Sequence, residues 1–169
     1  MRVSLRLVDF LIALPAAMGG CAYNGGSFTY GLSPFVGDRA TVGCLDVAVV
    51  RRADLPAGGA ALGYMFGNRC DHPMPLDLLS VNVIGRTADG REVELLPFDP
   101  GHDIRPLSID GRTSGEEAIA YHNSAALTEV CVDVASIVHE RPARWICMSS
   151  NAPEPVPQPT TASATTEAS

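Results

Sequence analysis

The chain has 169 residues, enough for one domain with a buried core and flanking segments. It carries 12 basic residues against 19 acidic ones, which gives a formal net charge of -7, and every basic residue is arginine. The arginines form no cluster, so the composition argues against nucleic-acid binding and against electrostatic docking on anionic lipid. Any membrane association must therefore come from a covalent lipid or an apolar segment.

The first 20 residues have the parts of an export signal. Two arginines lie near the start, an apolar run follows over residues 10–18, and two glycines stand directly before Cys21. The apolar run is too short for a membrane-spanning helix, which needs about 20 residues. The sequence therefore predicts that residues 1–20 are removed as a signal peptide.

The segment Met18-Gly19-Gly20-Cys21 is similar to a lipobox, in which an aliphatic residue and two small residues precede an invariant cysteine. On these residues the chain resembles bacterial lipoproteins with type II signal peptides. The resemblance implies transfer of diacylglycerol to the thiol of Cys21, cleavage before it, and acylation of the new amine. Ala22 follows the cysteine, which in many lipoproteins goes with transport to the outer membrane. The alternative is an ordinary secretory signal, with Cys21 as a free or paired thiol.

Residues 21–39 are rich in glycine, serine and aromatic residues and have no helical periodicity. They are expected to be a tether between the lipid and the domain, either disordered or ordered in part. Two acyl chains hold a protein at a membrane far more firmly than one, since each buried methylene contributes about 0.8 kcal/mol. We expect an acidic domain that is anchored to the cell envelope through Cys21.

The next hundred residues carry strand signals and no long amphipathic helix. A helix over 125–138 is disfavoured because its valines alternate with a period of two. The segments are predicted to form a single immunoglobulin-like β-sandwich over 40–148, with Tyr121 and Trp145 as aromatic residues of the core or its edge. Residues 149–169 are rich in Pro, Thr, Ala and Ser and are expected to be disordered. Seven strands are predicted, over 41–51, 61–69, 79–86, 92–98, 116–122, 129–137 and 144–148.

Four cysteines remain within this domain, and an even number in an exported protein indicates two disulfides. Three pairings are open. The spacing favours Cys44 with Cys70 and Cys131 with Cys147, because each pair lies symmetrically about a turn-like segment. A zinc site is disfavoured because no two cysteines have CxxC spacing.

Side-chain alternation assigns the faces of two of these strands. The aliphatic residues of 41–51 are expected to face the core, while Cys44 and Asp46 face outward. The same alternation places Cys131 and Asp133 on the outer face of their strand.

One loop has residues that could hold a ligand. Asp99, His102 and Asp103 are close in sequence, and Asp110 follows a few residues later. Carboxylate oxygens suit calcium, and a histidine shifts the preference toward a transition metal. Because Pro100 restricts the loop and the carboxylates lack regular spacing, a solvated turn is the favoured interpretation, and no metal site is assigned.

No catalytic motif is present in the sequence. Ser114 and His122 would be the members of a hydrolase site, but Ser114 has no nucleophile-elbow context. The sequence predicts a membrane-anchored, non-enzymatic envelope lipoprotein with no cofactor, acting as a structural module or binding a protein or glycan partner. The alternative is a lipoprotein that binds a small ligand or metal ion through the loop from Asp99 to Asp110.

Overall fold

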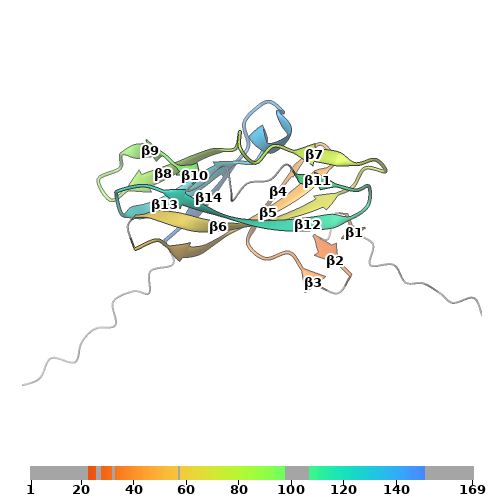
Figure 1. Ribbon diagram of the computed structural model, residues 1–169, viewed down its shortest axis with the longest axis horizontal. Helices are drawn as coiled ribbons and strands as arrows, with labels where there is room; N and C mark the ends of the chain where they lie inside the picture. Colours follow the sequence, from red (N-terminus) through yellow and green to blue (C-terminus); the bar gives the residue numbers. More distant parts are fainter. Residues whose placement is uncertain (1–22, 26–27, 32, 57, 98–106, 151–169) are drawn as a thin grey trace, which may run out of the picture.

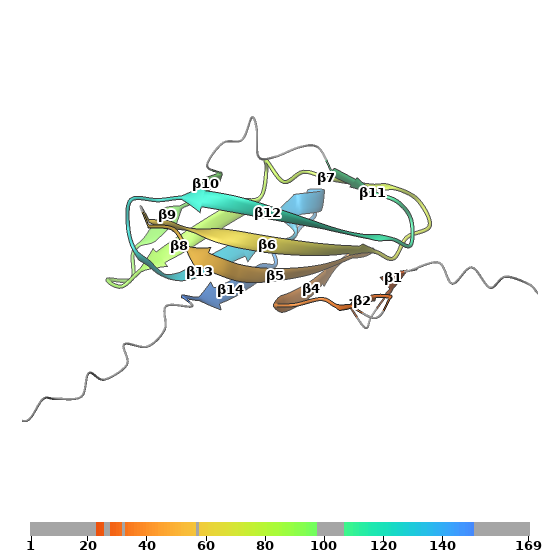
Figure 2. The ribbon, with the colours of Figure 1, turned by 60° about the horizontal axis from the view of Figure 1, so that its bottom comes forward.

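The computed structural model describes residues 23–25, 28–31, 33–56, 58–97 and 107–150. Over these residues the chain forms antiparallel strands and one short 3-10 helix, η1 (Ser136–Val138). The fold is drawn in two views in Figures 1 and 2.

Two sheets pack face to face, as both views show (Figures 1 and 2). The larger sheet has the order β10 (Leu96–Pro97), β12 (Ser114–His122), β6 (Gly59–Asn68), β5 (Leu45–Asp54) and β4 (Asp38–Val42). The smaller sheet has the order β14 (Trp145–Ser149), β13 (Leu127–Asp133), β8 (Asn82–Thr87) and β9 (Glu92–Glu94). The all-β, immunoglobulin-like sandwich predicted from the sequence is confirmed.

Two small sheets complete the described fold. Strand β7 (Met74–Leu76) pairs with β11 (Leu107–Ile109). Near the N-terminus, β1 (Tyr23–Asn24), β2 (Thr29–Tyr30) and β3 (Ser33–Pro34) form a three-stranded sheet. None of these five short strands was predicted from the sequence.

Three predicted strands differ from those observed. The segment 41–51 is divided between β4 and β5 by a turn at Gly43, whose φ of 54° lies in the region that favours glycine. The segment 92–98 supplies β9 to one sheet and β10 to the other. The segment 129–137 leaves the sheet after Asp133 and continues into η1.

The core between the two sheets follows the predicted alternation. Alternate residues of β5 are buried in it, namely Leu45, Val47 and Val49. The buried core also contains Tyr64 and Tyr121, whose hydroxyl groups are hydrogen-bonded at 2.8 Å. Trp145 was predicted to lie in the core or at its edge, and it lies on the edge strand rather than inside the core. It is 42% exposed because it lies on the outward-facing side of the edge strand β14, where Ile146 and Met148 point inward.

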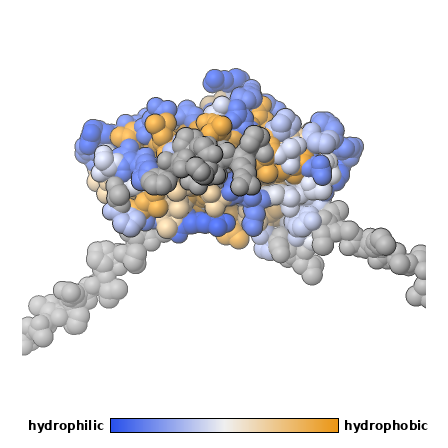
Figure 3. All heavy atoms as spheres, in the orientation of Figure 1, coloured by the Kyte–Doolittle hydropathy of each residue, from blue (hydrophilic) through white to orange (hydrophobic). Residues whose placement is uncertain are grey.

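Figure 3 shows hydrophilic residues over much of one face, with apolar residues gathered in smaller groups between them. The described part of the chain contains no helix with the length and hydropathy needed to cross a membrane.

Alkaline pH is expected to destabilise this fold through its two core tyrosines. Burial raises the pKa of Tyr121 to about 12, and burial together with Tyr121 raises the pKa of Tyr64. An unfolded tyrosine loses its proton near pH ~10. Above that pH the unfolded state binds fewer protons than the native state, so the free energy of unfolding falls.

Urea denaturation should therefore show stability decreasing from about pH 10 to about pH 12. The Tyr64→Phe/Tyr121→Phe double variant removes both titrating groups as a pair and should show a shallower decrease. An unchanged decrease in the double variant would contradict this explanation.

Candidate functional site

The segment that leads into the sandwich covers the outer face of the larger sheet. Strands β1, β2 and β3 with Phe35 are called the N-terminal ribbon here. The ribbon differs from the tether predicted over 21–39, because apolar side chains of the ribbon and the sheet pack together. This second apolar cluster contains Tyr23, Phe28, Phe35, Ala48 and Met65.

Tyr23 fixes the start of the ribbon at three points. Its phenol donates a hydrogen bond of 2.6 Å to the carboxylate of Asp46, and its backbone N–H donates one of 3.0 Å to the carbonyl of Arg112. Its ring occupies the space beside Gly67, where an added Cβ would overlap the ring. The ring also stacks on Phe35, with centroids 5.4 Å apart. Tyr23 is therefore 5% exposed.

Asp46 is the centre of the polar contacts beneath the ribbon. Its side chain is fully buried and accepts hydrogen bonds of 2.6 Å each from Tyr23 and from the hydroxyl of Thr41. The guanidinium of Arg69 lies 3.4 Å away. Burial and the hydrogen bond to Asp46 raise the pKa of Tyr23, so its phenol stays protonated and remains a donor.

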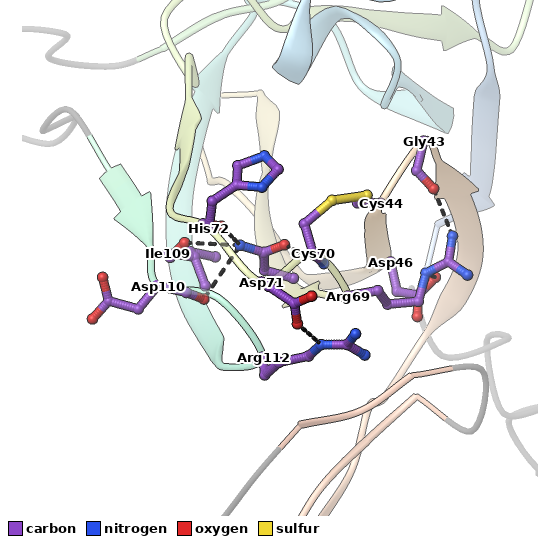
Figure 4. The surroundings of a disulfide bond; sticks show 11 residues. Gly43, Cys44, Asp46, Arg69, Cys70, Asp71, His72, Ile109, Asp110 and Arg112 are labelled. Carbon is purple, nitrogen blue, oxygen red and sulfur yellow. Dashed lines mark hydrogen bonds and ion pairs between the residues drawn. A yellow bond between two sulfur atoms is a disulfide. The ribbon is translucent and has the colours of Figure 1, made fainter.

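The Cys44–Cys70 disulfide lies directly beside this network (Figure 4). It links the turn before β5 to the residues after β6, and so closes the open end of that hairpin. Arg69 also donates a hydrogen bond of 2.5 Å to the carbonyl of Gly43. The predicted pairing is confirmed.

Hydrogen bonds join a third segment to this end of the sandwich (Figure 4). The amide of Asn68 donates to the carbonyls of His72 and Ile109, at 2.8 and 3.1 Å. Arg112 forms an ion pair of 2.7 Å with Asp71. Because these polar groups are already partnered, the arrangement is suited to holding the chain in place rather than to acid–base chemistry.

Of the candidate ligand residues in the predicted loop, the structure describes Asp110. Asp99, His102 and Asp103 lie outside the described residues, as does Cys21. Asp110 is exposed in the turn before β12, where its carbonyl accepts a hydrogen bond of 2.8 Å from the hydroxyl of Thr113.

The second predicted disulfide, Cys131–Cys147, is also present and joins directly opposed residues of β13 and β14. Glu129 lies beside it, with its carboxylate 3.8 Å from the sulfur of Cys131. Metal ligation requires thiolates, and both sulfurs are in the disulfide. The group is therefore a structural bridge in the oxidised protein.

Ser114 and His122 do not form a catalytic pair. They lie at opposite ends of β12. Eight residues along a strand span about 26 Å, which is far beyond hydrogen-bond reach.

An apolar cavity of about 480 Å³ lies between the segment after β7 and the helix η1. Its walls include the buried side chains of Leu76, Leu78 and Ile137. Pockets for small ligands are usually of this size and character. The sequence did not predict it, because its walls come from segments about 60 residues apart.

Charged groups line part of this cavity. The imidazole of His139 lies 3.2 Å from the carboxylate of Asp77, and Glu140 is also among the lining residues. A hydrogen bond from the hydroxyl of Ser80 lowers the pKa of Asp77, which keeps this carboxylate ionised. The cavity thus combines apolar walls with a fixed negative charge.

No protein-family model matches the chain, and no curated protein matches it. Among solved structures, the chain is similar to MPT63, a secreted protein from Mycobacterium tuberculosis. The two share 18% sequence identity, over 52% of this chain and 72% of that one, with a TM-score of 0.35. With an identity and a TM-score this low, the fold rests on the strands of this chain itself.

Loss of the Tyr23 hydroxyl is expected to destabilise the protein. Tyr23→Phe keeps the ring against Gly67 but removes one donor from the buried carboxylate of Asp46. A hydrogen bond to a charged group contributes about 1.5–3 kcal/mol. Urea denaturation should show a loss of that order. Tyr30→Phe is the matched control, since Tyr30 lies in the same ribbon and is 38% exposed. Equal stability of the two variants would contradict the role of this hydrogen bond.

Proposed function

We propose that the chain is a lipid-anchored module of the bacterial cell envelope, attached through Cys21 and carried to the outer membrane. In this proposal it acts without enzymatic activity or cofactor, as a structural module or by binding a protein or glycan partner.

The cysteine pairing is the observation that carries the proposal. The chain has 5 cysteines, and the two disulfides use four of them. Disulfides are typical of proteins that fold in an oxidising compartment outside the cytosol. Cys21 is left with no partner cysteine in the chain, and it stands directly after an apolar segment and two glycines. A lipid on its thiol would explain both its position and its lack of a partner.

Intact mass of the mature protein, extracted from membranes with detergent, tests the anchor. The expected species begins at Cys21, carries acyl chains, and gains four alkylated thiols only after reduction. Cys21→Ser should keep its signal peptide and gain no lipid, whereas Ala22→Ser, at the neighbouring position, should be processed normally. A lipid-free, soluble species of the unsubstituted chain would contradict the proposal.

The apolar cavity favours a second function, the binding of a small apolar molecule that carries a positive charge. Its apolar walls would bury the body of such a ligand, and the ionised carboxylate of Asp77 complements the charge. This site differs from the loop between Asp99 and Asp110, which the alternative hypothesis from the sequence assigned to a small ligand or metal ion.

Thermal denaturation in the presence of short alkylammonium ions tests the cavity. A ligand that binds only the native state raises its stability. We expect alkylammonium ions to raise the melting temperature and alkyl sulfates of the same length to leave it unchanged. Asp77→Asn should abolish the difference, whereas Asp71→Asn, an exposed carboxylate at another site, should preserve it. A lack of stabilisation by the cations, or a difference that survives Asp77→Asn, would contradict this function.

A further inference from the structure

The described chain begins and ends at opposite ends of the sandwich. Strand β5 connects the two ends: Asp46 binds Tyr23 near its start, and Asp54 accepts a hydrogen bond of 2.6 Å from Ser150 at its finish. Eight residues along a strand span about 26 Å. Figures 1 and 2 show this arrangement, with β1 at one end of the sandwich and the end of β14 at the other.

We call the end where the described chain begins the entry pole and the end where it finishes the exit pole. The entry pole contains Cys44, Cys70, Asp71, His72 and Arg112, which surround the first disulfide (Figure 4). The exit pole contains Pro56, Ser124, Ala126 and Ser150, which line a shallow groove of about 390 Å³.

Very little chain separates Cys21 from the entry pole. Two residue steps lead from Cys21 to Tyr23, and an extended chain covers at most about 3.6 Å per residue. The Cα atom of Cys21 therefore lies within about 7 Å of that of Tyr23. Tyr23 is held by Asp46, by the carbonyl of Arg112 and by the notch at Gly67. A lipid on Cys21 would be separated from the docked Tyr23 by one residue only.

We infer that the entry pole lies against the headgroup surface of the membrane and that the exit pole points away from it. This inference rests on the proposed lipid at Cys21. The side chains of Asp71 and Arg112 are 83% and 61% exposed, and charged groups are stable in the hydrated headgroup region but not in hydrocarbon. The domain is thus held on the surface of the bilayer without insertion. The exit pole is the end of the domain that faces away from the membrane.

Energy transfer from a labelled site to acceptor-labelled lipid headgroups tests this orientation. The sequence contains no lysine, so one introduced lysine gives a unique side-chain amine for labelling. His72→Lys places the donor at the entry pole and Ser124→Lys places it at the exit pole, and both positions are exposed. In vesicles carrying the full-length, processed protein, we expect transfer from position 72 to exceed that from position 124 several-fold.

A flexible spacer provides the matched control. Insertion of a long Gly/Ser segment directly after Cys21 keeps the lipid and the fold but removes the short connection to Tyr23. The difference in transfer between the two positions should then shrink. Equal transfer from both positions in the unmodified protein, or stronger transfer from position 124, would overturn the inferred orientation.

Intact mass measured on the same samples distinguishes a wrong orientation from a failure of the lipid anchor. If the mature chain carries no acyl groups, the proposed function fails at that step. The orientation is then tested on chain coupled through the Cys21 thiol to a maleimide lipid. Its α-amino group is capped beforehand, at a pH where the lysine amine is protonated. The same several-fold difference in energy transfer between positions 72 and 124 is expected. The orientation of the domain is therefore tested whether or not Cys21 carries a natural lipid.

Discussion

The buried carboxylate of Asp46 is the constraint on which the N-terminal half of the structure depends. A charge removed from water is strongly unfavourable unless hydrogen bonds and an opposite charge replace the solvent. Tyr23 and Thr41 donate to this carboxylate, and Arg69 supplies the positive charge. These partners come from the N-terminal ribbon, β4 and the end of β6. The carboxylate of Asp46 therefore has all of these partners only when the ribbon is packed on the sheet.

The apolar contacts of the ribbon also make the outer face of the larger sheet depend on the ribbon. The outer face of β5 and β6 carries Ala48, Met65 and Gly67, which would leave an apolar patch beside the buried charge. The rings of Tyr23 and Phe35 cover it. The small side chains are needed for this, because a larger residue in place of Gly67 would occupy the space of the Tyr23 ring. The ribbon therefore acts as an extra layer of the sandwich, and it brings the chain from Cys21 directly to the entry pole.

Much of the sandwich could be predicted because its signals are local. The alternating valines of β5 and β13 indicate strands with one buried face, and the symmetric spacing of the cysteines favours the observed disulfides. The ribbon could not be predicted, because what orders it is Gly67 and Asp46, which are distant in sequence and carry no signal of their role. The cavity beside η1 was missed for the same reason, since it exists only where two distant segments meet. The outward orientation of Trp145 could not be predicted, because a short alternating strand does not reveal which of its faces is inward.

The central claim is that the ribbon is an ordered part of the domain, which makes the connection from Cys21 to the domain short. Amide hydrogen exchange of the mature protein at Tyr23 tests it most directly, since this N–H donates to the carbonyl of Arg112. A docked ribbon predicts that the Tyr23 amide exchanges far more slowly than an unstructured amide, and that Asp46→Ala abolishes this protection while the amides of β13 stay protected. Exchange of the Tyr23 amide at the rate of an unstructured chain in the unsubstituted protein would contradict the account.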